Sequence, residues 1–131
     1  MTKSLVIALA QLNAHLGNVA GNIDRLVTAR AKAAKDGAAF IVTPEMYLSG
    51  YPCDDLVLRD DFMGEIAAGI AQLAEITSDA GPAIIVGAPH AENGHIFNSV
   101  FVLDAGQIIA RRDKVNLPNY GVFDDKRNFT A

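Results

Sequence analysis

Two ionisable side chains, Glu45 and Lys114, each follow an apolar run of strand-like composition. Glu45 comes directly after residues 40–43 and Pro44, and Lys114 comes after residues 107–110 and a short charged segment. In sheets built from alternating strands and helices, ligands lie beyond the carboxyl ends of the strands. A partly desolvated carboxylate there suits a general base, and an ammonium suits oxyanion stabilisation if its strand neighbours that of the base. Taken singly, each residue is more typical of a solvated surface.

The other reactive side chains make weaker candidates. Cys53 is the only cysteine, so the chain forms no internal disulfide and no thiolate metal site. Its neighbours Asp54 and Asp55 raise the pKa of its thiol, which favours a structural role over a nucleophilic one. His90 and His95 flank an expected turn without a third ligand, so no metal site is predicted.

Composition places the chain among globular proteins of one domain. It has 131 residues, half of them apolar, and a formal net charge of −4. The basic pairs Arg111-Arg112 and Lys126-Arg127 are too few for a nucleic-acid footprint. The longest apolar stretches are about five to eight residues, far below a membrane span. We therefore expect a soluble, cytoplasmic protein with no nucleic-acid or membrane partner, and a single cysteine suits a reducing compartment.

The first half of the chain has the pattern of strand, helix and strand. A short apolar run at residues 4–12 predicts a buried strand. Asn22 is predicted to cap a helix that Gly37 ends, because these residue types favour helix starts and stops. Residues 40–43 form a second apolar run that Pro44 closes.

The second half repeats the alternation and adds a hairpin. After the loop PEMYLSGYPCDD a second helix is expected, which Gly81 and Pro82 end. Further strands are expected at residues 83–86, 97–103 and 107–110, the last two joined by a turn. The apolar face of the second helix is predicted to consist of Phe62, Ile66, Ile70, Leu73 and Thr77. Strands that alternate with helices indicate an α/β fold with right-handed crossovers and an antiparallel edge.

The order of these motifs resembles the nitrilase superfamily. The relevant segments are PEMYLSGYP, IIVGAP and NSVFVLDAGQIIARRDKVNLPNYGVFDDKRNF, within a match from Leu5 to Phe129. The last segment contains LPNYGVFD followed by Lys126-Arg127, which narrows the likeness to the amino-terminal glutaminase domains of glutamine-dependent NAD+ synthetases.

The resemblance implies a fold and a set of site residues. Residues 1–131 are expected to be the amino-terminal half of a nitrilase-like α-β-β-α sandwich, with the rest of that domain and a synthetase domain absent. By the same likeness Glu45 is the general base and Lys114 the oxyanion-stabilising lysine. Tyr51, Tyr120 and Phe123 fall at positions that shape the glutamine pocket, where aromatic walls exclude water.

The resemblance also implies a reaction in NAD biosynthesis. Glutamine is hydrolysed through a thioester, and the released ammonia is passed to a synthetase domain that amidates nicotinic acid adenine dinucleotide. ATP and Mg²⁺ serve that second domain, so no cofactor is expected in this one.

Two departures from the family pattern affect these expectations. Asp125 stands where the subfamily usually has a second glutamate, and its shorter side chain orients Lys114 less closely. The nucleophilic cysteine of the family lies downstream, and Cys53 does not match it. We therefore expect the chain alone to have no glutaminase turnover, to expose an apolar sheet face and to form homo-oligomers.

Three other interpretations remain open at this point. The chain could be a fragment of another nitrilase-family amidase. It could be a small receiver-like or flavodoxin-like binding domain, although such domains need an aspartate at a strand end where this chain has Glu45. It could also be a non-catalytic interaction domain of nitrilase-like shape.

Overall fold

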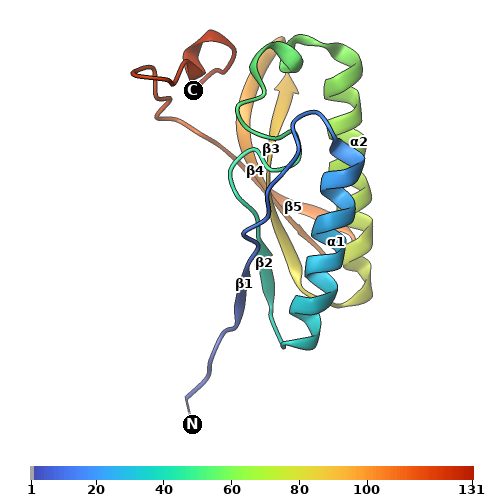
Figure 1. Cartoon of the computed structure of the whole chain (residues 1–131). Helices are drawn as coiled ribbons and strands as arrows, with labels where there is room; N and C mark the ends of the chain where they lie inside the picture. Colours follow the sequence, from blue (N-terminus) through green and yellow to red (C-terminus); the bar gives the residue numbers. More distant parts are fainter. Residues whose placement is uncertain (1) are drawn as a thin grey trace.

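The apolar runs pair into one five-stranded sheet whose strands lie in chain order, with both long helices on one face (Figure 1). The computed structural model describes residues 2–131. β1, β2 and β3 are parallel, whereas β3, β4 and β5 are antiparallel. The elements are β1 (Ile7–Leu9), α1 (Val19–Lys35), β2 (Phe40–Val42), α2 (Asp60–Ile76), β3 (Ala83–Glu92), β4 (His95–Asp104) and β5 (Gln107–Asp113). The expected α/β class is confirmed.

The first helix begins four residues earlier than predicted. Asn18 is the cap, and its side chain accepts a hydrogen bond from the Gly21 N–H at 3.0 Å. The prediction of Asn22 as the cap is therefore wrong. Asn22 is buried inside α1, where its amide donates to the carbonyl oxygens of His15 and Leu48. These two hydrogen bonds join α1 to the loops that follow β1 and β2.

The second helix buries the face that its spacing predicted, and all five residues of that face are buried. The helix itself ends at Ile76, because Ala80 adopts a left-handed conformation after a short 3₁₀ turn, before Gly81 and Pro82 are reached. Within residues 2–131 no helix is long and apolar enough to cross a membrane.

Strand lengths differ from the sequence-based expectation in both directions. Only Ile7–Leu9 of the predicted 4–12 strand pairs, because its partner β2 is three residues long. β3 extends well past Val86, to Glu92, and pairs with β4 from Ile84 to Glu92. Asn93 and Gly94 both have positive φ and close that hairpin, the usual chemistry of a two-residue turn.

Two adjacent rows of side chains show how the sheet divides its faces. The row against the helices is Ala8, Ile41, Ile84, Leu103 and Ile108. Its three central members are 0–1% exposed and belong to the main core. The next row, on the opposite face, is Leu9, Val42, Ile85, Val102 and Ala110. This second row is apolar across all five strands.

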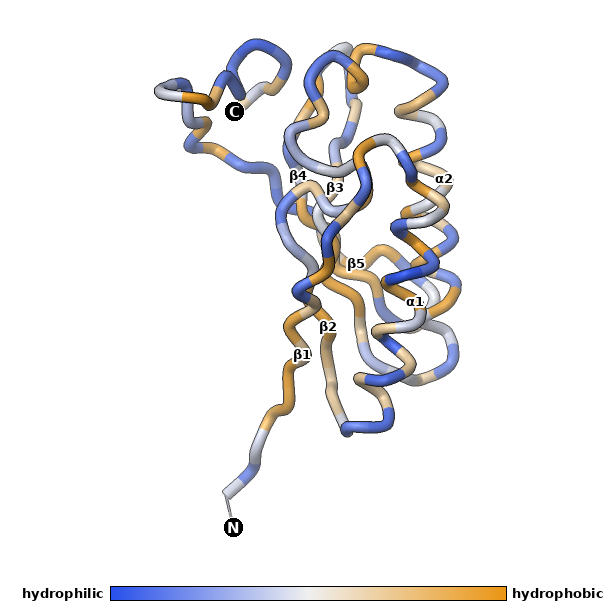
Figure 2. Tube along the Cα trace, in the orientation of Figure 1, coloured by the Kyte–Doolittle hydropathy of each residue, from blue (hydrophilic) through white to orange (hydrophobic). Residues whose placement is uncertain are grey.

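Within residues 2–131 no helix or second sheet covers the opposite face. Leu9 is 72% exposed and Ile7 is 48% exposed, so the expectation that the first strand is buried is wrong. Figure 2 shows this apolar strand at the edge of the sheet, away from both helices. An apolar sheet face open to water is unusual in a stable monomer and favours association.

The loop after β2 lies unusually close to β3. A Cβ added at Gly87 would stand 2.6 Å from the backbone nitrogen of Met46 and 2.9 Å from the Pro44 carbonyl oxygen. The Gly87 carbonyl accepts a hydrogen bond from the Leu48 N–H at 3.0 Å. Glycine at this position therefore lets the segment that contains Glu45 cross the sheet.

Gly87→Ala is expected to destabilise the chain by about 1–3 kcal/mol, because the new methyl group overlaps backbone atoms that have no flexible way to move. Chemical denaturation measures the change. The matched control is Gly64→Ala in α2, where nothing lies within 4 Å and the same substitution should stabilise by about 0.5–1 kcal/mol. Equal effects at the two positions would contradict the close approach.

The open face is expected to bind a hydrophobic dye and to make the chain self-associate. Replacing Leu9 and Val100 together by lysine should weaken both effects, because both side chains are exposed on that face. Gln72→Lys, on the solvent side of α2, adds charge elsewhere and is the control. Size-exclusion chromatography with dye fluorescence tests this, and a dilute monomer that binds no dye would contradict it.

Candidate active site

The two strand-end residues meet directly. Nζ of Lys114 lies 2.8 Å from Oε1 of Glu45. Their strands, β2 and β5, run in the same direction but are not neighbours, because β3 and β4 lie between them. The contact forms because the loop after β2 crosses β3 at Gly87 and brings Glu45 toward the end of β5.

Asn98, on β4, binds both residues of this pair. Its side-chain Nδ2 donates to Oε1 of Glu45 at 2.7 Å, and its carbonyl oxygen accepts from the backbone N–H of Lys114 at 2.8 Å. Asn98 is only 4% exposed. Two donors thus hold Oε1 of Glu45, and within residues 2–131 no hydrogen bond reaches its Oε2.

Asp125 is the second carboxylate near the lysine. It is 5% exposed, its Oδ2 lies 3.4 Å from Nζ of Lys114, and its Oδ1 accepts a hydrogen bond from the Tyr51 hydroxyl at 3.0 Å. The lysine contact is longer than the one to Glu45, as a short aspartate side chain would give. Asp125 therefore links the lysine to the loop that follows Glu45.

Lys114 stays charged in this setting. Burial alone would lower the pKa of its ammonium, but the carboxylates of Glu45 and Asp125 outweigh that effect and raise it. A lysine held this way donates hydrogen bonds and does not act as a base at neutral pH.

Tyr51 is likewise kept in its protonated form. Burial is the main cause that raises the pKa of its phenol, and the hydrogen bond and negative charge of Asp125 add to the effect. The hydroxyl therefore donates, and it orients Asp125 without competing for a proton.

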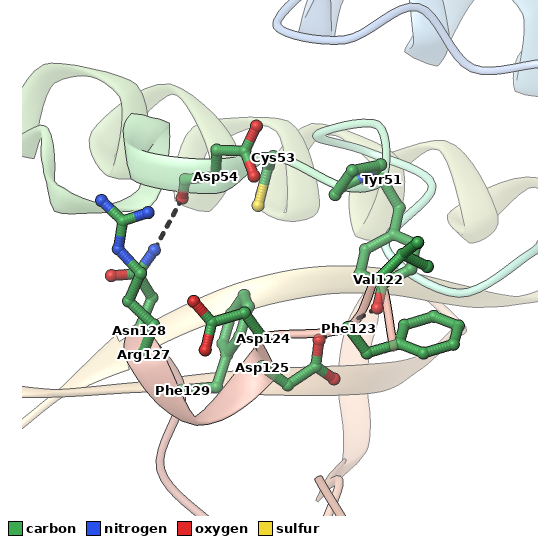
Figure 3. Close-up of a pocket in the computed structure, with 11 residues that line it drawn as sticks. Tyr51, Cys53, Asp54, Val122, Phe123, Asp124, Asp125, Arg127, Asn128 and Phe129 are labelled. Carbon is green, nitrogen blue, oxygen red and sulfur yellow. Dashed lines mark hydrogen bonds between the residues drawn. The ribbon is translucent and has the colours of Figure 1, made fainter. Parts of the chain in front are cut away.

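A cavity of about 220 Å³ lies between the loop after Gly50 and the segment 122–129. Tyr51, Phe123 and Asp125 line it together (Figure 3). Tyr120 lies outside it and is 73% exposed, with its ring edge-on to Phe123 at 6.0 Å between centroids. The structure thus places Tyr51 and Phe123, two of the three residues expected to shape the glutamine pocket, in this cavity together with Asp125, and it places Tyr120 outside it.

Cys53 lines the same cavity but is a poor nucleophile. It is buried, and burial is the main cause that raises the pKa of its thiol to about 11, with Asp54 and Asp125 adding to the effect. In Figure 3 its sulfur points from the loop toward the segment 122–129. At neutral pH it is a thiol, and no base contacts it in the described chain.

Asn98 and Gly87 also shape the site, although neither residue was assigned a contact from the sequence. The available signal for Asn98 was a carboxamide beside Ser99 in a strand that is mostly apolar, because a buried polar side chain must find a partner. For Gly87 the signal was a glycine inside a strand, which often marks a close backbone approach. Neither signal names the partner.

Comparisons of the sequence and of the structure with known proteins point to the same family. The model of the carbon-nitrogen hydrolase family matches residues 6–130. The glutamine-dependent NAD(+) synthetase of Acinetobacter baylyi is 39% identical over 129 residues, which cover 98% of this chain and 23% of that protein. The chain thus spans about a quarter of the length of this curated relative.

Solved structures show the same architecture. The glutamine-dependent NAD+ synthetase of Acinetobacter baumannii, in complex with ADP, superposes with a TM-score of 0.91 at 37% identity, over 98% of this chain and 24% of that one. An amidase from Nesterenkonia sp. AN1 superposes with a TM-score of 0.82 at 27% identity, over 97% of this chain and 49% of that one. In that structure acrylamide has added to the active-site cysteine of the amidase. With its fold, its strand-end pair and its match over nearly the whole length, this chain belongs to the carbon-nitrogen hydrolase family.

Proposed function

We propose that this chain supplies the general base and the oxyanion lysine of a glutaminase that feeds ammonia to NAD+ synthesis. The observation that carries the proposal is the contact of 2.8 Å between Glu45 and Lys114, which together line an open cavity of about 280 Å³. The cavity lined by Tyr51, Phe123 and Asp125 adjoins this pair, because Asp125 contacts Lys114. The likeness to glutamine-dependent NAD+ synthetases over 98% of the chain supports glutamine as the substrate.

Glu45 performs the proton transfers in this proposal. Its free Oε2 takes the proton of a cysteine thiol supplied by sequence beyond this chain, and the sulfur attacks the side-chain amide carbon of glutamine. The C–N bond then breaks, and the proton held by Glu45 goes to the departing ammonia. A water molecule, deprotonated by the same oxygen, attacks the thioester and releases glutamate and the thiol.

Lys114 stabilises the negative charge that forms in both steps. Each attack turns a carbonyl oxygen into an oxyanion, and a fixed ammonium next to that oxygen lowers the barrier. The raised pKa of Lys114 keeps this charge present at neutral pH. Asp125 and Tyr51 hold the ammonium in place from the cavity side.

The cavity provides a site for the substrate side chain. Tyr51 and Phe123 offer apolar walls that exclude water, and the Tyr120 ring packs edge-on against Phe123 outside the cavity. The ammonia serves a synthetase region outside residues 1–131, which uses ATP and Mg²⁺ to amidate nicotinic acid adenine dinucleotide. On this proposal residues 1–131 are the amino-terminal part of the glutaminase domain, and the protein works in the cytoplasm as a homo-oligomer.

A chimera tests the proposal. Residues 1–131 replace the matching segment of the Acinetobacter baylyi synthetase, and glutamate release from glutamine is measured. The chimera should be active, and Glu45→Gln should lower kcat by about 100-fold or more because the base is lost while the shape is kept. Lys114→Met should lower kcat by about 100-fold or more, since one oxyanion donor is removed.

The same assay separates this proposal from its rival. Activity on small aliphatic amides without activity on glutamine would favour an amidase like the Nesterenkonia enzyme. Full activity of Glu45→Gln in a folded chimera would contradict the proposed base.

Residues 1–131 alone should release no glutamate, because removing the nucleophile from such a site costs about 10⁶-fold in kcat.

Cys53 should also react slowly with iodoacetamide at pH 7–8, and faster only as pH approaches the raised pKa of about 11. Turnover by the isolated chain that vanishes in Cys53→Ser would overturn both statements.

A further inference from the structure

We infer that Asn98 is a positioning residue that fixes which oxygen of Glu45 takes the proton. This inference deepens the proposed function and rests on it. Asn98 and Lys114 both donate to Oε1, at 2.7 and 2.8 Å, so this oxygen is held by two donors, whereas Oε2 accepts no hydrogen bond within residues 2–131. Because a shift of about 1 Å at a reacting group can cost about 100-fold in rate, such fixing is catalytically useful.

The second donor matters because Lys114 has another task. During the reaction the ammonium must turn some of its hydrogen-bonding capacity toward the substrate oxyanion. The hydrogen bond from Lys114 to Glu45 then weakens. The Asn98 amide does not bind the oxyanion, so its hydrogen bond to Glu45 is kept. Asn98 is neutral, so it orients the base without adding a charge that would compete with Lys114.

The place of Asn98 in the sheet makes it a rigid support. It lies on β4, a central strand paired on both sides, and it is almost fully buried. Its carbonyl oxygen also accepts from the backbone N–H of Lys114. One residue thus sets both the carboxylate orientation of Glu45 and the path of the chain into Lys114.

The neighbouring Ser99 provides a matched control. It is buried to a similar extent, but its side chain points to the other face of β4 and donates to Asp113. Ser99→Ala removes one buried side-chain hydrogen bond without touching Glu45. A purely structural role for Asn98 predicts similar effects at both positions.

The first test needs no turnover and uses the chain itself. In ¹H–¹⁵N spectra, one side-chain amide proton of Asn98 should lie downfield of those of exposed asparagines, because it donates to a carboxylate. Glu45→Ala should move it back toward them, and Ser99→Ala should not. The inference would be overturned if the amide proton shifts of Asn98 matched those of exposed asparagines and did not change in Glu45→Ala.

The second test uses the active chimera. Asn98→Ala should lower kcat by about 10- to 100-fold with KM changed by less than about threefold, because orientation and not binding is lost. Asn98→Asp keeps the shape but places a second anion against Glu45, so its kcat should fall at least as far. Ser99→Ala should keep kcat within about threefold, since it loses only one ordinary hydrogen bond.

The outcomes separate the inference from the proposed function. An inactive wild-type chimera counts against the glutaminase proposal, and the amide spectra alone then decide whether Asn98 holds Glu45. An active chimera in which Asn98→Asp matches wild type, or in which Ser99→Ala and Asn98→Ala lose equal activity, would overturn the positioning role. Thermal unfolding of each variant shows whether a loss of activity is merely a loss of fold.

Discussion

The geometry of the site depends on one carboxylate oxygen, Oε1 of Glu45. Oε1 of Glu45 receives hydrogen bonds from β4 and from the end of β5, although its own strand is β2. That geometry requires the loop after β2 to cross β3, which only a residue without a side chain permits at Gly87. It also requires the long β3–β4 and β4–β5 hairpins, because short strands would not hold Asn98 and Lys114 in register.

One cation and two neutral donors satisfy the two carboxylates at this site. Two carboxylates, Glu45 and Asp125, share the single ammonium of Lys114, and each also accepts from an uncharged group, Asn98 or Tyr51. Asp125 is buried, and a buried carboxylate is costly without such partners, whereas the Glu45 side chain is 45% exposed. The arrangement leaves one glutamate oxygen unbound, which is the feature a general base needs.

The sheet that places the site is covered on only one face. α1 and α2 bury the row centred on Ile84, while the parallel row centred on Ile85 faces away from them. At the end of this sheet the Glu45 side chain is 45% exposed. The exposed face and the exposed site therefore have one cause, which is the two-layer arrangement of these residues.

Local patterns in the sequence determined the alternation of elements, the buried face of α2 and the strand-end positions of Glu45 and Lys114, because periodicity and turn chemistry are short-range properties. The motif LPNYGVFD indicated the family. Only the tertiary structure decided that Asn22 is a buried anchor and that β1 is exposed. It alone paired Asn98 with Glu45, 53 residues apart, and it gave the direct contact of Lys114 with Glu45, 69 residues apart, whose shared site the family resemblance had implied. Such contacts depend on strand order, register and the crossing at Gly87, and no local pattern encodes these.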